Sequence, residues 1–333
     1  MIYDKPFLNY EEQLEKLKNT YNLKSYNHEN DIMLLKTISY YDLVNGYKDC
    51  FMENNKFVGE VTLADIFFFN NTDKRFQNIL FLYSVYIENI FKTKMAHLIG
   101  QTRGVEFSQY LDINKYHSSN PKRNKKLEET IKNMIFAHNF SQDSPTKYYR
   151  NNHNHIPPWI LFKNTKFTTI IDLFSFLKKD EKLAIISEYS YFSTPKLSDD
   201  KKIELFKNMI TVVRKFRNKI AHNYKIIGVN LEKTKLNLRD ISYISPYKFL
   251  SSYDIRNRRG ENDLYAMIIS LFFLLEPLLL KLLFATELKG FSVTEKSDIY
   301  FKMYNFPNNF KENIENIYST LTEELKDNPS TNK

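Results

Sequence analysis

The run from Leu264 to Ala285 constrains the fold more than any other part of the sequence, because it is apolar on almost every side. A helix of this kind needs either other helices or a lipid bilayer around it. Glu276, Pro277 and Lys281 interrupt the run, and charges and prolines are costly or disruptive in the middle of a membrane. The sequence therefore favours a helix buried inside a larger protein over a membrane-associated effector.

The rest of the chain contains enough helical pattern to surround such a segment. Apolar residues recur at helical spacing in most segments, and the 333 residues include only 7 glycines and 10 prolines. The expected fold class is all-α. We expect an N-terminal helical region over residues 1–60, a larger helical domain over residues 61–326, and a flexible tail over residues 327–333.

Charge and cysteine content narrow the class of protein. The formal net charge is +9, which favours a nucleic acid or an anionic surface as partner. An AT-rich genome would also raise the lysine content without any functional cause. Cys50 is the one cysteine, so an internal disulfide framework and a zinc ribbon are excluded. The first residues lack an apolar signal core, and we expect a cytoplasmic protein. We expect neither a metal site nor a cofactor.

The segment from Arg214 to Lys225 carries the strongest functional signal. On a helical wheel Met209, Val212, Val213, Phe216 and Ile220 share one side, which should be buried. The opposite side carries Arg214, Asn218, Ala221 and Lys225. Arg217 and His222 flank this polar side, ~7.5 Å apart along the axis of a straight helix. A guanidinium beside an imidazole is suited to breaking a phosphodiester. The alternative is a pair of solvated side chains with a structural role.

Other cations are candidates for contacts with a nucleic-acid backbone, for which clustered lysine and arginine side chains suffice. Solvated surface is the alternative in each case. The candidates are Lys122, Arg123, Lys125, Lys126, Arg256, Arg258 and Arg259. Lys92 and His97 repeat the spacing of Arg217 and His222, a cation followed five residues later by Ala-His. Coincidence or a buried, hydrogen-bonded His97 explains this match more simply than a second site, and an accessory role in RNA contact is the alternative.

Several separated segments resemble the Abi family of bacterial abortive-infection proteins, the AbiD/AbiF-like group, with the AbiF branch as the nearest likeness. The order and spacing of these segments hold over most of residues 3–225. They are Lys5–Gln13 (KPFLNYEEQ), Tyr41–Tyr47 (YDLVNGY), Pro157-Pro158-Trp159 with Leu173–Phe176, and Arg217–His222 (RNKIAH). Asn45 stands where the second block is expected to have a small residue.

The resemblance implies membership of the HEPN group of helical proteins, whose motif is Arg, usually a polar residue, and then His after four to six intervening positions. It therefore implies a HEPN-type helical bundle with an N-terminal helical extension. It also implies a metal-independent endoribonuclease that serves as a phage-defence or toxin effector. Arg217, His222 and Asn218 match the motif and would be its catalytic residues. A small non-coding RNA is implied as a restraining antitoxin.

The resemblance also implies two motif helices placed face to face. This chain has one good motif, so we expect a symmetric homodimer with a composite site. A pairing of the Arg217 motif with the Lys92–His97 segment inside one chain is the alternative. RNA is the expected partner, with Arg214 and Lys225 contacting its backbone. A non-catalytic protein that grips a small structured RNA is the alternative function.

Overall fold

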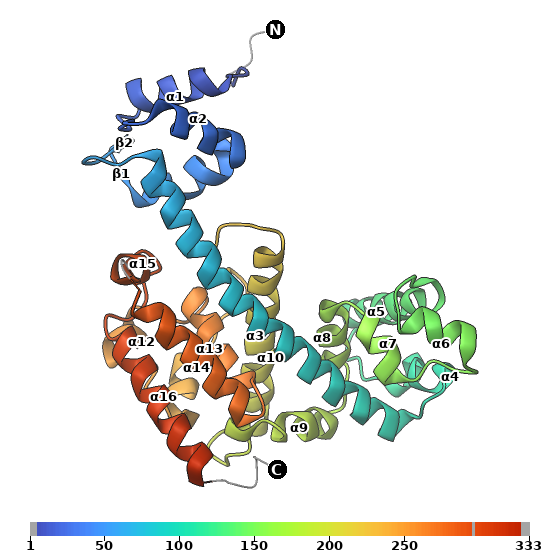
Figure 1. Ribbon diagram of the computed structural model, residues 1–333. Helices are drawn as coiled ribbons and strands as arrows, with labels where there is room; N and C mark the ends of the chain where they lie inside the picture. The colour runs from blue at the N-terminus through green and yellow to red at the C-terminus, as the bar shows by residue number, and fades with distance from the viewer. Residues whose placement is uncertain (1–4, 295–296, 328–333) are drawn as a thin grey trace.

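The computed structural model describes residues 5–294 and 297–327, and helices dominate it (Figure 1). Helix makes up 69% of the structure, so the predicted all-α class is confirmed. The described residues contain one small sheet, an antiparallel hairpin of β1 (Met52–Glu53) and β2 (Lys56–Phe57). Asn54 and Asn55 form its turn with positive φ, a conformation that asparagine tolerates better than most residues.

The N-terminal part of the chain forms a small lobe with its own apolar cluster, which includes Leu14, Leu43, Phe57 and Ile66. Asn9 and Glu12 form a capping box at the start of the first helix. The lobe contains α1 (Tyr10–Asn19), α2 (His28–Thr37), the π-helix η1 (Tyr41–Asn45), the 3₁₀-helix η2 (Lys48–Cys50) and the hairpin.

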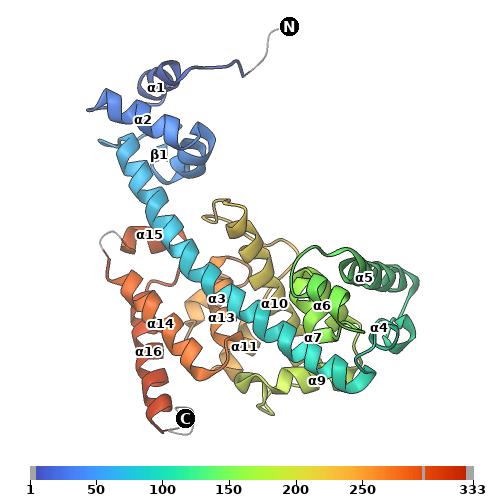
Figure 2. The same cartoon turned by 45° about the vertical axis from the view of Figure 1, so that its right-hand side comes forward.

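A single long helix, α3 (Leu63–Arg103), leaves this lobe and crosses the rest of the molecule (Figures 1 and 2). Its 41 residues correspond to a length of about 60 Å. The sequence suggests a short helix and then a break at Asn70-Asn71, and this is wrong. The pair lacks the glycine or proline that ends helices, and Asn70 is buried inside the helix instead. Residues of α3 belong to both apolar clusters, so the helix does not mark where one domain ends and the next begins. The domain boundary near residue 60 therefore stays a prediction.

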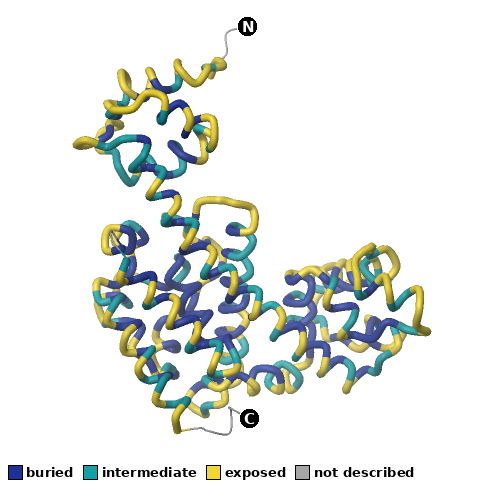
Figure 3. Tube along the Cα trace, in the orientation of Figure 1, coloured by how far each residue is buried: buried dark blue, intermediate teal, exposed yellow. Residues whose placement is uncertain are grey.

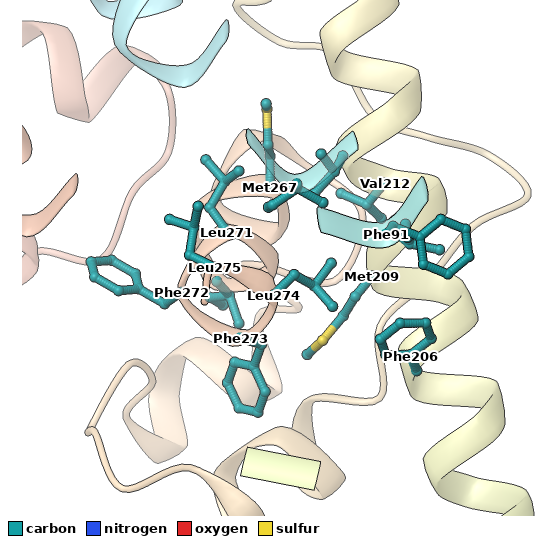
Figure 4. Close-up of a cluster of buried hydrophobic side chains, with 14 of the residues drawn as sticks. Phe91, Phe206, Met209, Val212, Met267, Leu271, Phe272, Phe273, Leu274 and Leu275 are labelled. Atoms are coloured by element: carbon teal, nitrogen blue, oxygen red, sulfur yellow. The ribbon is translucent and has the colours of Figure 1, made fainter. Parts of the chain in front are cut away.

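The largest core surrounds α13 (Leu264–Leu274), in which every residue is buried. The helices α10 (Asp199–Ala221) and α3 pack against it. Figure 4 shows Met209 and Val212 of α10 together with Met267 and Leu271 of α13. The remaining helices of this region are α11 (Leu238–Ile244), α12 (Ser252–Arg256), α14 (Leu278–Ser292), α15 (Ser297–Met303) and α16 (Phe310–Asp327).

The apolar run is two helices, not the single helix expected. Pro277 is the N-cap of α14, which buries only part of its surface. Lys281, inside the run, is buried and forms an ion pair with Glu276 at 3.0 Å. In the described part of the chain, no helix combines the length and the apolarity that a bilayer crossing requires.

A third group of helices lies on the other side of α3 from α14 and α16 (Figures 1 and 2). Figure 3 shows buried segments inside this group as well as inside the central bundle. It contains α4 (Phe107–Tyr110), the 3₁₀-helix η3 (Ile113–Lys115), α5 (Pro121–Phe140), α6 (Thr146–Asn152), α7 (Pro158–Asn164) and α8 (Phe167–Ser175). Below it, α9 (Lys179–Ser187) and the 3₁₀-helix η4 (Ser190–Phe192) lead to α10.

A buried carboxylate joins the N-terminal lobe to the central bundle. Asp73 of α3 is fully buried and accepts hydrogen bonds from Tyr47, Tyr300 and Tyr304, and from Gln77. Tyr47 belongs to the lobe, while Tyr300 lies on α15 and Tyr304 follows it. The hydroxyl and amide donors satisfy an anion that would otherwise be costly to bury. The predicted tail over residues 327–333 lies, apart from Asp327, outside the described residues.

Candidate functional site

The apolar side of α10 is buried as predicted: Met209, Val212, Val213, Phe216 and Ile220 all lie in the central core. The helix ends at Ala221, and Asn223 has a positive φ of 60°. The backbone N–H of Asn223 donates to the carbonyl of Ile220, and that of Tyr224 donates to Lys219. These two bonds form a Schellman motif, which satisfies the last carbonyls of the helix.

This motif fixes His222 at the end of α10. Its backbone N–H donates to the carbonyl of Asn218 at 3.1 Å, while its side chain is exposed. The imidazole ring lies 6.4 Å from the ring of Tyr224, measured between centroids. The local backbone is therefore fixed by hydrogen bonds, and the titratable ring remains accessible to a ligand.

Arg217 lies between α10 and α3. Its Nη2 is 3.2 Å from Oε2 of Glu88, and its guanidinium lies over the ring of Phe81 at 5.7 Å. Its Nη1 donates to Oδ1 of Asn218 at 3.3 Å. The side chain keeps 29% of its surface exposed. The guanidinium is thus held by an anion and an aromatic ring, and part of it remains open to solvent.

Glu88 forms a second ion pair with Lys92 of the same helix, with 2.8 Å between Oε1 and Nζ. The Nζ of Lys92 also donates to the carbonyl of Lys163. Burial lowers the pKa of Lys92, and the Glu88 carboxylate acts in the opposite direction. His97 is exposed. Of the two simpler explanations for the repeated spacing, the buried, hydrogen-bonded His97 is therefore wrong, and coincidence is left. Lys92 therefore faces α10 and the Arg217 ion pair, whereas His97 faces solvent.

Arg214 and Asn218 line one hollow on the outer side of α10, of about 410 Å³. Lys215, Lys219 and Lys233 line it as well. Arg214 also donates to the hydroxyl of Thr168 on α8 at 3.3 Å. The structure therefore brings the two predicted residues together on a basic surface, next to the end of the helix.

Lys225 does not continue the polar side of α10, because the chain turns away at Asn223. It lies 3.9 Å from Asp49 of the N-terminal lobe and lines a second cavity, of about 560 Å³. The wheel position predicted for Lys225 is wrong for this reason. The cavity lies between η1, α3 and the end of α10, and the segment Tyr41–Tyr47 forms one of its walls.

The cations at the start of α5 divide into two kinds. Lys122 and Lys125 are exposed. Arg123 donates to the carbonyl of Ser175 at 2.9 Å, and Lys126 is 2.5 Å from Asp172 of α8. The pKa of Lys207 on α10 is lowered, mainly by burial and to a smaller extent by the charges of Arg123 and Lys126. The basic start of α5 is therefore electrostatically coupled to the surface of α10.

The cations at α12 lie elsewhere. Figure 1 places α12 on the opposite side of the molecule from α5. Arg256 and Arg258 are exposed, whereas Arg259 bonds to Asp254 at 3.3 Å and to Asn305 at 3.2 Å. The structure therefore separates these residues from the α5 cluster.

Sequence reasoning did not identify Glu88, Lys74 or Tyr224. The spacing of Glu88 and Lys92 is that of a helical ion pair, which was an available signal. The contact of Glu88 with Arg217 joins segments far apart in the chain, and no local pattern predicts it. Within the described ranges, His, Cys, Asp and Glu side chains do not gather in threes as a metal ion would require.

The geometry describes an all-α protein with a histidine and an arginine near the end of one helix and basic hollows beside them. A profile of the family described as "Abi-like protein" matches residues 33–228, more than half of the chain. The chain therefore belongs to the Abi-like protein family, and at the level of that family a role in abortive infection, a form of phage defence, is supported. The match includes Tyr41–Tyr47 and Arg217–His222 but not Lys5–Gln13. The chain matches no curated protein and no solved structure.

Proposed function

We propose that this protein is an endoribonuclease of the HEPN type, from the AbiF-like branch, and that it acts in phage defence. RNA is its substrate, and an antitoxin such as a small non-coding RNA restrains it. The observation that carries the proposal is the placement of His222: an exposed imidazole at a hydrogen-bonded helix end, five residues after an arginine held in place by Glu88.

The proposed reaction uses the nucleophile that RNA itself contains. His222 accepts the proton of a ribose 2′-OH, and the 2′ oxygen attacks the adjacent phosphorus. The bond between phosphorus and the 5′ oxygen breaks, and an acid protonates that oxygen. The products are a 2′,3′-cyclic phosphate and a 5′-hydroxyl. No metal is required to supply a nucleophile in this step.

Arg217 stabilises the charge that develops on the phosphate oxygens. Its ion pair with Glu88 and its contact with Phe81 hold the guanidinium in one place before substrate arrives. Preorganisation of this kind lowers the cost of orienting a donor during the reaction. Asn218, hydrogen-bonded to Arg217, serves as a positioning residue.

One motif provides a single histidine, while the reaction needs a base and an acid on opposite sides of the scissile bond. We therefore propose a symmetric homodimer in which His222 of the second copy supplies the other proton transfer. The exposure of His222 is compatible with such a composite site.

One observation favours a second candidate, a non-catalytic RNA-binding protein. Glu88 already pairs with Arg217 and so competes with phosphate for that cation. In this alternative Arg217 has a structural role, and the basic hollows grip a structured RNA that stays intact.

Purified protein incubated with total RNA separates the two candidates. The nuclease predicts cleavage that generates 2′,3′-cyclic phosphate ends and that is lost in His222→Ala. The binding protein predicts bound RNA that remains uncut at any protein ratio. Sequencing the RNA that copurifies with the wild type and with His222→Ala identifies both a restraining RNA and a cleaved target.

A further inference from the structure

The cavity between the N-terminal lobe and the end of α10 is large enough for a ligand, and lysine and tyrosine side chains are part of its lining. Its volume of about 560 Å³ lies within the range of ~300–1,000 Å³ typical of ligand sites. Lys74, Lys219 and Lys225 contribute three ammonium groups to its lining, and Asp42 contributes one carboxylate. Such a lining favours an anion.

Two exposed aromatic side chains from separate segments of the chain line this cavity. Tyr41, from η1, is 75% exposed, and Tyr224, after α10, is 62% exposed. Bases of single-stranded RNA stack on such rings with little regard to sequence. Tyrosines beside lysines are therefore the combination expected for a base and its phosphate.

The backbone of the cavity wall is fixed. In η1, Leu43 and Val44 are buried in the lobe, so Tyr41 and Asp42 face outward. Short π-helical segments of this kind are rare and are found frequently at functional sites. On the other wall, the Nζ of Lys74 donates to the carbonyl of Asn223 at 3.3 Å, which links α3 to the Schellman turn.

The cavity lies at the end of α10 that also carries His222. Asn223 and Tyr224 line it, and His222 precedes them in the chain. Lys219 lines both this cavity and the hollow that contains Arg214 and Asn218. A single strand that follows the basic residues of α10 thus passes from that hollow into the cavity. This continuity favours an RNA strand over a free nucleotide.

We propose that this cavity is a subsite for one nucleotide of single-stranded RNA next to the scissile phosphate, with its base stacked on Tyr41 and its phosphate bound by Lys219 and Lys225. The proposal rests on the proposed ribonuclease function for the position of the scissile bond. The binding of RNA in the cavity can be tested without cleavage.

The test uses the full chain carrying His222→Ala, so that the probe stays intact. A fluorescent single-stranded RNA of mixed sequence is titrated against this protein and against the same protein with Tyr41→Ala. Tyr41→Ala removes the ring on which the base stacks, so we expect the dissociation constant for the RNA to rise about 10-fold or more. Tyr26→Ala is the matched control, because Tyr26 belongs to the same lobe, is 73% exposed and lies outside the cavity lining.

A second readout locates the RNA. RNA containing 4-thiouridine is cross-linked to the His222→Ala protein, and peptides that cover residues 37–47 and 219–225 should carry the cross-link. Competition with a free mononucleotide should leave the cross-link intact if a strand is the ligand. Equal affinity of the Tyr41→Ala and Tyr26→Ala proteins, cross-links confined to other peptides, or full competition by the mononucleotide would overturn the proposal.

Failure of the subsite and failure of the nuclease proposal give different results. If the wild type cuts RNA and Tyr41→Ala leaves KM and RNA affinity unchanged, the subsite is wrong and the nuclease stands. If the wild type leaves RNA uncut and Tyr41→Ala still weakens binding with cross-links in the cavity, the nuclease is wrong and the binding site stands.

Discussion

Arg217 of α10 and Glu88 of α3 form an ion pair with 3.2 Å between Nη2 and Oε2. Glu88 also binds Lys92 at 2.8 Å, so one carboxylate holds two cations between the helices. Both cations lose hydration there, and Glu88 offsets that loss. The pair explains how Arg217 keeps one position beside the open end of α10. We therefore expect both the stability of the protein and the proposed activity to depend on Glu88.

Glu88→Gln should therefore lower the free energy of unfolding by about 1–3 kcal/mol, because the buried Lys92 and the partly buried Arg217 lose their anion. RNA cleavage should fall as well, since Arg217 is no longer held. Urea unfolding and an RNA cleavage assay measure the two effects. Glu315→Gln, which breaks the more exposed pair with Lys289, is the control and should cost less than ~1 kcal/mol. Equal effects of the two substitutions would contradict this role for Glu88.

Tyr47→Phe tests the joint between the N-terminal lobe and the central bundle. Burial, the charge of Asp73 and the hydrogen bond to it raise the pKa of Tyr47 above its ordinary value of 10.0. The folded state therefore retains this proton while the unfolded state releases it. The stability that the hydroxyl contributes is present below pH 10 and is lost as the pH rises above 10.

The substitution should cost about 1 kcal/mol at neutral pH. It should also make the alkaline loss of stability shallower than in the wild type. Urea unfolding across the alkaline range measures both quantities, and Tyr148→Phe at an exposed tyrosine is the control. An alkaline slope identical to that of the wild type would show that Tyr47 does not hold its proton in this way.

The helical class and the buried side of α10 could be predicted from the sequence, because apolar periodicity records which side of a helix meets a core. The points at which helices are interrupted are harder to predict from the sequence. The pair Asn70-Asn71 does not break α3, since the surrounding packing outweighs the weak helix propensity of asparagine. Pro277 does break the apolar run, since its ring and missing N–H act locally in any context.

The candidate site could be predicted only in part. Arg217, Asn218 and His222 lie in one local motif, so their spacing together with the family resemblance singles them out, and their catalytic role stays a prediction. Glu88 and Lys74 meet the motif helix through α3, and Tyr41 reaches the cavity from another lobe. Contacts between distant segments leave no periodic signal in a single sequence. The turn at Asn223, which moves Lys225 away from the helix, needs hydrogen bonds that a wheel does not represent.

The exposed lysines at the start of α5 should contribute to RNA affinity through phosphate contacts. Removing both in Lys122→Gln/Lys125→Gln should reduce the slope of log K against log salt by about 1.4 for single-stranded RNA. Binding titrations at several salt concentrations measure the slope. Arg256→Gln/Arg258→Gln, across the molecule at α12, should leave it unchanged (Figure 1). A larger change at α12 than at α5 would place the RNA on the other side of the protein.

The composite site predicts that the active protein is a homodimer. Sedimentation velocity with an uncleavable RNA should give a complex that contains two copies of the 39.9 kDa chain in addition to the mass of the RNA. The same measurement on the free protein shows whether RNA promotes association. A monomer mass with RNA bound, together with unimpaired cleavage by the wild type, would exclude a site shared between two copies.

The most direct test of the proposed catalytic role of His222 is the rate at which the His222→Ala protein cleaves RNA. His222 is exposed, so the variant should fold as the wild type does, and its urea unfolding curve should be unchanged. We expect cleavage to fall by about 10²–10⁴-fold, the usual contribution of a general acid or base. His153 is an exposed histidine at the C-cap of α6, and the His153→Ala protein should cleave RNA at the wild-type rate. A folded His222→Ala protein that still generates 2′,3′-cyclic phosphate ends at the wild-type rate would contradict the account.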